Sequence, residues 1–379
     1  MIVEKLSNEI DIKKQLKKLG VDAGGINILA SKAKIHIICI HDLHVGAANI
    51  LKQDALSIGA DLAVPRGTVV AAKPRVDCLL IANTKQLKNL AKKELAQPFE
   101  LKELAHKLQA FTQIQKPKSV DIMGVINAND DSFYASSRFQ GATAIHVIEQ
   151  MIQEGAAIID IGAVSSRPNA SLVSVEEELA RIEPILSLIK KEKLYEKVKF
   201  SCDSYEPKVL QKALQSGFTI VNDITGLQND EVCKLCASYN ATAVIMHMQG
   251  TPRTMQKNPH YENILSEVYD FFDVRMQKAE SFGIKNIVLD VGIGFGKTVE
   301  NNLTLLKNLE HFLTLDKPLL VGASRKSMID KISASSVEQR LAGTLALHLE
   351  ALKNGASILR VHDVPEHVQA LKVFRALSL

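Results

Sequence analysis

The sequence predicts an α/β protein, with a (β/α)8 barrel over residues 116–379 preceded by a small α/β domain over residues 1–115. The last two-thirds of the chain contain eight apolar runs, each ending in a polar or charged residue and separated by amphipathic segments of helical length. Eight such units in about 260 residues match a barrel of this kind. An open doubly wound sheet also alternates strands and helices, but rarely contains eight equivalent units.

The eight predicted strands of the barrel are short and end beside polar residues. They span residues 120–127, 157–162, 198–204, 219–223, 242–247, 286–290, 319–324 and 357–362. In a (β/α)8 barrel, reactive groups gather where the strands end. We therefore expect the polar residues at these ends to form the functional site.

The N-terminal domain is predicted from two apolar runs, at residues 35–40 and 78–83, that are typical of strands. Two helices are expected after them, the first ended by Pro98. Their predicted apolar faces consist of Leu87, Leu90, Ala91 and Leu95, and of Leu101, Leu104, Ala105 and Leu108. The polar segment 113–119 is the predicted junction with the barrel. The sequence assigns this domain no role.

Composition and charge exclude several classes of protein. The net charge of +4 is mild, the chain has no Trp, and no basic stripe is interleaved with aromatic residues, so nucleic acid is not an expected partner. No apolar run is long enough to span a bilayer, and the N-terminus lacks the apolar core of a signal peptide. We expect a cytoplasmic protein without membrane association.

The cysteines and the histidine pair of the N-terminal domain give weak signals. Five cysteines argue against a disulfide framework. Cys233 and Cys236 form a CxxC without a second pair, which favours buried helix thiols over zinc or redox chemistry. Cys202 lies in a predicted strand, where a thiol is usually a core residue. His41 and His44 lack an evident set of partner ligands, so a loop role is favoured over metal binding.

Three polar residues end predicted strands of the barrel: Asp203, Asn222 and Asp290. A carboxylate can accept two parallel N–H bonds from an aminopyrimidine edge, and Asn offers both a donor and an acceptor. Lys326, after the seventh strand, would balance the two carboxylates. These residues favour a heterocycle with amino and ring N–H groups. The alternative is that each Asp caps the helix that follows it.

A second group of residues indicates an anionic ligand. Arg360 and His362 alternate onto the same side of the last strand, so both are expected at the barrel mouth beside Asn127. The loop at residues 129–132 carries four oxygen-bearing side chains, which suit a hard cation such as Mg²⁺. Together these residues predict a diphosphate clamp with a metal. A surface turn remains the alternative for the loop.

Three further loops complete the predicted mouth. The loop with Ser165, Ser166, Arg167 and Pro168 could cover a negatively charged ligand, or be exposed decoration. The run DVGIGFGKT fits neither nucleotide-binding glycine spacing, and instead predicts a tight loop that exposes Phe295. Met246 offers a polarisable surface for a flat ring, although Met at a strand end is more often core.

From about residue 119 onward, the chain resembles the dihydropteroate synthase family, with the motifs in the family's order and roughly its spacing. The motifs are GVINANDDSF, DIGAVSSRP, CDSY, VNDITGL, MHMQGTP, LDVGIGFGKT, VGASRKSMI, RLAGTLA and RVHDV. The resemblance implies a transferase of folate biosynthesis. Such an enzyme joins p-aminobenzoate to 6-hydroxymethyl-7,8-dihydropterin diphosphate, releases pyrophosphate with Mg²⁺, is a sulfonamide target and forms a homodimer.

The resemblance also assigns roles to residues of this chain. The implied pterin-binding set is Asp203, Asn222, Met246, Asp290, Gly322 and Lys326. The implied diphosphate and Mg²⁺ set is Asn127, Arg360 and His362. The implied p-aminobenzoate side is Ser166, Arg167, Pro168, Phe295 and Ser327. Asp131 keeps its family position in the first loop and is expected to act in turnover.

The chain departs from the family pattern mainly in the first loop, where Asn129 and Asp130 replace the usual Thr-Pro. Two other functions are also considered. One is a pterin-dependent methyltransferase of similar barrel architecture, although the cationic SRK tip and the RVHD segment favour a diphosphate substrate. The other is a pterin-binding protein without catalysis, with the N-terminal domain as a docking module.

Overall fold

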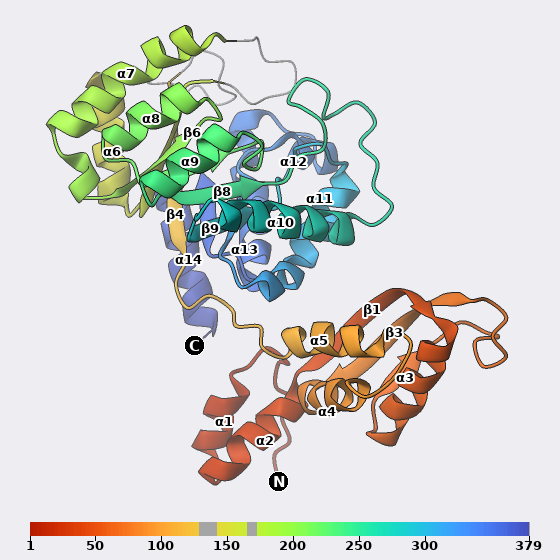
Figure 1. Cartoon of the computed structure of the whole chain (residues 1–379). Helices are drawn as coiled ribbons and strands as arrows, with labels where there is room; N and C mark the ends of the chain where they lie inside the picture. The colour runs from red at the N-terminus through yellow and green to blue at the C-terminus, as the bar shows by residue number, and fades with distance from the viewer. Residues whose placement is uncertain (129–141, 165–172, 379) are drawn as a thin grey trace. The chain divides into compact units, whose positions relative to one another are not determined.

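The computed structural model describes residues 1–128, 142–164 and 173–378 of the chain (Figure 1). The chain divides into two compact units. The N-terminal unit comprises Met1–Ile114 with Arg375–Leu379, and the barrel unit comprises Gln115–Phe374. Within the described residues, no helix is both long and apolar enough to cross a membrane.

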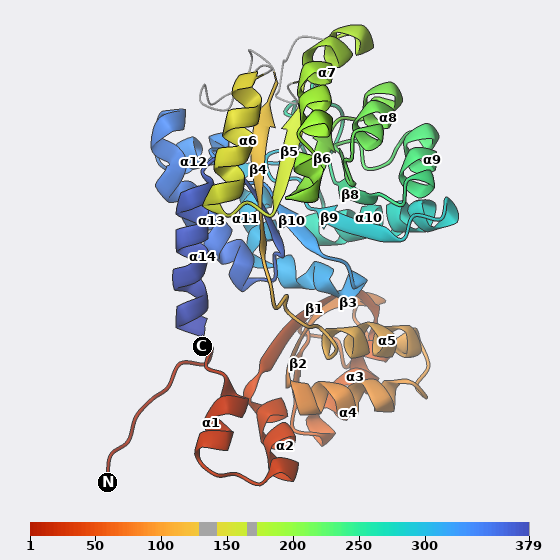
Figure 2. The ribbon, with the colours of Figure 1, turned by 90° about the vertical axis from the view of Figure 1, so that its left-hand side faces the viewer.

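The barrel unit is a closed barrel of eight parallel strands with helices outside them, as predicted (Figure 2). Around the barrel the strands follow the order β10, β11, β4, β5, β6, β7, β8 and β9, so neighbours in sequence are also neighbours in space. The strands are β4 (Asp121–Asn127), β5 (Ile158–Gly162), β6 (Lys199–Asp203), β7 (Ile220–Asp223), β8 (Thr242–Met246), β9 (Asn286–Asp290), β10 (Leu319–Val321) and β11 (Ile358–Val361). Each lies within the residues predicted for it.

Helices follow the strands and pack against them to form the hydrophobic core around the barrel. They are α6 (Ala142–Glu154), α7 (Val175–Lys191), α8 (Pro207–Gln215), α9 (Asp230–Ser238), α10 (Ile264–Ser281), α11 (Val299–Lys307), α12 (Ser327–Ile332), α13 (Leu341–Lys353) and α14 (Val364–Ser378). Short 3-10 turns are η2 (Leu194–Glu196), η3 (Leu309–Leu315) and η4 (Val337–Arg340). Cys233 and Cys236 are buried thiols of α9, as expected.

The inside of the barrel has its own apolar layer, separate from the core under the helices. Its residues are Met123, Ile158, Ile220, Val244, Val288, Leu320 and Ile358. Successive side chains of a strand alternate between the two faces of a sheet, so a residue two positions later points inward again, nearer to the mouth. This alternation determines which side chains enter the functional site.

The N-terminal unit contains a three-stranded antiparallel sheet in the order β1 (Ile35–His44), β3 (Arg75–Asn83) and β2 (Asp61–Ala63). Along β3, side chains alternate between buried and exposed, so one face of the sheet is covered and the other carries exposed apolar residues. The helices are α1 (Ile12–Lys18), α2 (Ala23–Ala33), α3 (Val45–Ser57), α4 (Thr84–Glu94) and α5 (Leu101–Phe111). The pattern predicted β1, β3, α4 and α5, but not β2 or α1 to α3.

The HDLH segment is not a loop, contrary to expectation. A bulge between Ile40 and Leu43, with Asp42 at a φ of 53°, lets β1 continue to His44. The Nδ1 of His44 accepts a hydrogen bond from the backbone N–H of Gly46 and so caps α3. His41 lies 3.1 Å from a carboxylate oxygen of Asp77, a partner that sequence alone did not reveal.

Candidate active site

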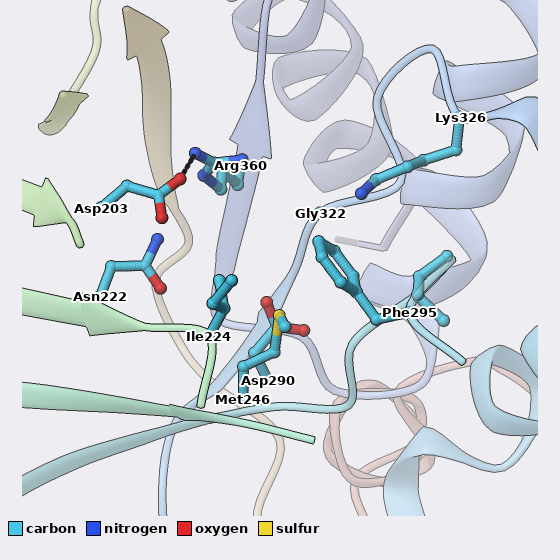
Figure 3. A pocket seen from close by; sticks show the side chains of 10 residues that line it. Asp203, Asn222, Ile224, Met246, Asp290, Phe295, Gly322, Lys326 and Arg360 are labelled. Carbon is cyan, nitrogen blue, oxygen red and sulfur yellow. Dashed lines mark hydrogen bonds and ion pairs between the residues drawn. The ribbon is translucent and has the colours of Figure 1, made fainter. Parts of the chain in front are cut away.

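A pocket lies where the barrel strands end, and Figure 3 shows the side chains that line it. Its lining residues are Asp203, Asn222, Ile224, Met246, Asp290, Ile293, Phe295, Gly322, Lys326 and Arg360. The space among these side chains, including the part that opens to solvent, is about 330 Å³. The pocket therefore contains the entire pterin-binding set implied by the sequence, together with Phe295 and Arg360.

Strand periodicity explains why these polar residues meet. Asn222, Asp290 and Arg360 each follow a residue of the inner apolar layer by two positions. They consequently form the next layer toward the mouth. Asp203 ends β6 at the same level, in register with Asn222 on β7. The alternative that Asp203 caps the next helix is wrong, because Glu206 occupies the N-cap position of α8.

Arg360 is the central cation of the pocket. Its Nε lies 2.6 Å from Oδ2 of Asp160, and its Nη2 lies 2.6 Å from Oδ2 of Asp203. Asn222 donates from Nδ2 to the same oxygen of Asp160 at 3.2 Å. One guanidinium thus joins β11 to β5 and β6 by short charge-assisted bonds.

Asp160 was missed by the sequence analysis, which treated the run IIDIG only as a buried strand. Its side chain is fully buried, and its Oδ1 has no hydrogen-bond partner among the described residues. A buried carboxylate requires a cation or several hydrogen bonds. The sequence did show a charged residue, Asp160, inside an otherwise apolar strand. It did not show that the partner of Asp160 is Arg360, 200 residues further along the chain.

Burial shifts the ionisation of the pocket residues. It raises the pKa of Asp203 to about 7, and the neighbouring guanidinium of Arg360 opposes this rise. Burial also raises the pKa of Asp290, while the backbone N–H of Gly292 and the ammonium of Lys326 oppose the change. Burial and the positive charge of Arg360 lower the pKa of Lys326 to about 8. The pocket therefore holds opposite charges in a largely dehydrated space.

The glycine-rich loop after β9 forms one wall of the pocket. Gly292 has a φ of 67°, and a Cβ there would lie only 2.0 Å from the carbonyl oxygen of His247, so no other residue fits. Phe295, at the loop's tip, has its ring centroid 4.3 Å from Nζ of Lys326. The loop is tight, as predicted, and Phe295 lines the pocket while being partly buried.

Lys297 holds the same loop through hydrogen bonds to its backbone. The sequence did not predict this role. Its buried ammonium donates to Nδ1 of His247 at 2.9 Å and to the backbone carbonyls of Gly292 and Phe295 at 3.1 and 3.0 Å. Burial lowers the pKa of Lys297 to about 7. The lysine of FGKT thus binds protein carbonyls here, whereas the lysine of a nucleotide-binding glycine loop contacts phosphates.

Three predicted residues lie outside the pocket lining. His362 follows β11, and its Nδ1 lies 2.9 Å from Oγ of Ser324. Burial, and then the charge of Arg360, lower the pKa of His362 to about 3, so its ring is neutral. Asn127 ends β4 in register with Gly162 and is partly exposed. Ser327 is exposed at the first position of α12.

Two predicted loops fall outside the described part of the chain. They are the first loop at residues 129–132, which includes Asp131, and the second loop with Ser165, Ser166, Arg167 and Pro168. Within residues 1–128, 142–164 and 173–378, no group of three or more His, Cys, Asp or Glu side chains could hold a metal ion.

Comparison with known proteins agrees with this geometry. The sequence model of the pterin binding enzyme family matches residues 123–362. The dihydropteroate synthase of Haemophilus influenzae is 42% identical over 68% of this chain and 94% of its own length. The chain belongs to the dihydropteroate synthase family of pterin-binding enzymes.

Solved synthases share the fold of the barrel unit. The Yersinia pestis dihydropteroate synthase, solved with a sulfonamide drug complex, is 34% identical. It covers 68% of this chain and 94% of its own, with a TM-score of 0.66.

One relative matches both units of the chain. The bifunctional dihydropteroate synthase/dihydropteroate reductase of Helicobacter pylori is 43% identical over 100% of this chain and 99% of its own length. This match extends over the whole chain, whereas the match to the Haemophilus influenzae synthase covers 68% of it.

Proposed function

We propose that the barrel mouth joins p-aminobenzoate to 6-hydroxymethyl-7,8-dihydropterin diphosphate, as the dihydropteroate synthase of folate biosynthesis. The observation that carries this function is the convergence of Asp203, Asn222, Asp290 and Lys326 on one pocket. These side chains complement the amino and ring N–H groups of a pterin. The family match supports the same substrates over a methyltransferase or a protein without catalysis.

The pterin binds at the inner end of the pocket. Asp203 and Asp290 accept N–H bonds from the heterocycle, and the ammonium of Lys326 faces the same pocket (Figure 3). Met246 and Phe295 supply apolar surface for its flat ring. Asp160 does not need to touch the substrate, because it holds Arg360 in place through a 2.6 Å bond.

The diphosphate lies toward the mouth, next to Arg360 and His362. The guanidinium of Arg360 stabilises negative charge that develops on the leaving group, as preorganised donors do in other enzymes. The arylamine nitrogen attacks the exocyclic carbon of the pterin, the C–O bond to diphosphate breaks, and the amine loses a proton. Ser166, Arg167, Pro168, Phe295 and Ser327 are proposed for the p-aminobenzoate side, and Asp131 for turnover in the first loop.

Mg²⁺ is proposed as the metal, and the donor chemistry at the mouth suits it. Mg²⁺ commonly takes one or two protein oxygens together with substrate phosphates and waters. Asn127 offers an amide oxygen at the end of β4, and the described residues provide no cluster that would hold a metal on its own. When bound, Mg²⁺ would neutralise part of the charge on the departing diphosphate.

The synthase is tested by measuring pyrophosphate release and dihydropteroate formation by the full chain. Formation of product should require both substrates and Mg²⁺. A sulfonamide should compete with p-aminobenzoate but not with the pterin diphosphate. A Lys212→Ala variant is the control, because Lys212 is exposed and pairs only with Glu183 at 3.2 Å in the described structure. Tight pterin binding without any product would reject the synthase and support a binding protein.

A second function, dihydropteroate reductase, is proposed from the full-length relative alone. The N-terminal unit is matched by the Helicobacter pylori bifunctional protein over its whole length. Reduction of dihydropteroate adds two electrons and two protons to a C=N bond, so a reductant is required. The full chain should consume dihydropteroate when given a reduced nicotinamide or a reduced flavin. The product, tetrahydropteroate, is detected by chromatography. Failure with both reductants would reject this function.

A homodimer and a cytoplasmic location are further proposals, which rest on the family resemblance and on the sequence. Light scattering coupled to size-exclusion chromatography tests the first, because a dimer doubles the chain mass of 41.6 kDa. A mass that stays at one chain across micromolar concentrations would reject the dimer.

A further inference from the structure

Two buried histidines on α13 and α14 lie behind the pocket, and no role has yet been assigned to them. His348 is 1% exposed and His367 is 2% exposed. Nδ1 of His348 lies 2.8 Å from Nε2 of His367. Neither ring lines the pocket. Buried polar atoms in proteins are normally hydrogen-bonded, so each ring nitrogen of the two imidazoles is expected to have a partner. The identity of these partners indicates the role of the pair.

The hydrogen bonds of the pair run in one direction. The backbone N–H of Ala323 donates to Nε2 of His348 at 3.0 Å, so this nitrogen carries no proton. The neutral ring must then carry its proton on Nδ1 and donate it to Nε2 of His367. His367 in turn donates from Nδ1 to the backbone carbonyl of Asp363. Burial keeps both rings neutral by lowering the pKa of each.

The first donor in this chain of bonds, the backbone N–H of Ala323, belongs to the loop that carries Lys326. Gly322 and Lys326, near the two ends of the loop, both line the pocket. Between them, Ala323 is held by His348, and the backbone N–H of Arg325 donates to Oγ1 of Thr344 at 2.9 Å. Thr344 and His348 lie four residues apart on α13, and therefore on the same face of the helix.

The loop needs external support, because its conformation is strained. Arg325 has a φ of 54°, which is unfavourable for a residue with a side chain. The two acceptors on α13 satisfy the buried N–H groups on either side of Ser324. Ser324 in turn contacts Nδ1 of His362 at 2.9 Å. A shift of this loop would therefore move both Lys326 and the partner of His362.

We propose that His348 and His367 are positioning residues of the synthase, which fix the loop after β10 so that Lys326 faces the pterin and Ser324 holds His362. His348 supplies the acceptor for Ala323, and His367 fixes the tautomer that makes this acceptor available. The inference rests on the proposed function for the identity of the ligand. It adds two residues of α13 and α14 that act through the loop and touch no substrate.

The test compares variants of the full chain that remove or retain the acceptor. His348→Leu leaves the N–H of Ala323 without an acceptor, whereas His348→Gln places a side-chain oxygen near the position of Nε2. The dissociation constant of the pterin diphosphate is measured by calorimetry without p-aminobenzoate, next to kcat, both KM values and Tm. His311→Leu is the control, because it removes a histidine ring on η3, partly buried in the barrel unit, that does not line the pocket.

His348→Leu should weaken pterin diphosphate binding and lower kcat/KM by roughly 10- to 100-fold, the scale of a misplaced contact. His348→Gln should recover most of both values, and His311→Leu should lower Tm while leaving the dissociation constant unchanged. The proposal is overturned if folded His348→Leu binds and turns over like the wild type, or if His348→Gln is equally impaired.

Should His348→Leu fail to fold, the partner histidine provides the test. His367→Leu removes the acceptor that fixes the His348 tautomer, and His367→Gln retains an oxygen there. Pterin diphosphate should bind at least threefold more weakly to the first than to the second, and equal affinities would overturn the proposal. A wild type that binds the pterin but makes no dihydropteroate would end the proposed function while leaving this binding comparison valid.

Discussion

Asp203 in the barrel and Glu94 in the N-terminal unit are both carboxyl groups whose pKa burial raises to about 7, yet their surroundings are opposite. Asp203 lies 2.6 Å from the guanidinium of Arg360 in an open pocket. Glu94 is fully buried in α4, and the carboxylate of Asp54 raises its pKa further.

The difference shows that a raised pKa does not by itself identify a functional group. Both shifts arise mainly from loss of water. At Asp203 a cation opposes the shift, and the side chain faces a cavity that a ligand can enter. At Glu94 a second carboxylate reinforces it, and the side chain faces only protein. We infer that Asp203 works as a charged ligand group and that Glu94 is a neutral core residue.

The largest expected effect on stability and activity comes from removing Arg360, the cation that pairs with Asp203. Arg360→Met leaves Asp160 and Asp203 buried without their partner, so the free energy of unfolding should fall by about 3–5 kcal/mol. The loss of charge stabilisation should lower kcat/KM by roughly 10²- to 10³-fold. Denaturant unfolding and steady-state kinetics measure the two effects. If stability and rate were both unchanged, the carboxylates would not depend on Arg360.

An intermediate effect is expected on the Glu94 side, without any change in synthase activity. The folded pKa is raised above 4.5, so the folded state holds the proton between about pH 4.5 and pH 7 while the unfolded state has lost it. Stability therefore falls as pH rises through this window. Glu94→Gln should remove the fall, and stabilise the unit at pH 8 by about 1–3 kcal/mol.

Hydrogen exchange of α4 at pH 5 and pH 8 measures this change in the full chain. Asp54→Asn serves as the matched control, because it removes the like charge but keeps the burial, and should give a smaller gain. Equal exchange rates in Glu94→Gln and the wild type at pH 8 would contradict the assignment of Glu94 as a neutral core residue.

The smallest expected effect is a pH dependence within the pocket. Because the pKa of Lys326 is lowered to about 8, its ammonium is lost as pH rises through that value. We expect kcat/KM to fall by about tenfold or less between pH 7 and pH 9. Lys326→Arg should move the limb to higher pH, since a guanidinium stays charged. An unmoved limb would assign the titration to another group.

The sequence predicted the architecture and the polar residues at the strand ends for one physical reason. The periodicity of a strand, and the polar residue that follows each apolar run, are properties of residues close together in the sequence, so both can be read from the sequence directly. Asn222, Asp290 and Arg360 therefore appeared as candidates at once. Their common pocket followed from the fold class, because parallel strands of a barrel end on one face.

What the sequence could not supply were pairs of distant residues. The role of Asp160 depends on its ion pair with Arg360, which is distant in the sequence. The role of Lys297 depends on carbonyl groups whose positions are known only from the folded loop. His348 was hidden in the apolar pattern of α13, and no local signal joined it to His367. The strand through His44 needed a bulge, and the positive φ of Asp42 has no signature in the pattern.

The one-way chain of hydrogen bonds through His348 and His367 has an evolutionary consequence. A sequence that loses only His348 strands a buried acceptor on His367, and one that loses only His367 strands a buried donor on His348. Each single replacement is therefore a less favourable intermediate than either end state. Among relatives of this chain, the two positions should change together, so that a histidine at one predicts a histidine at the other.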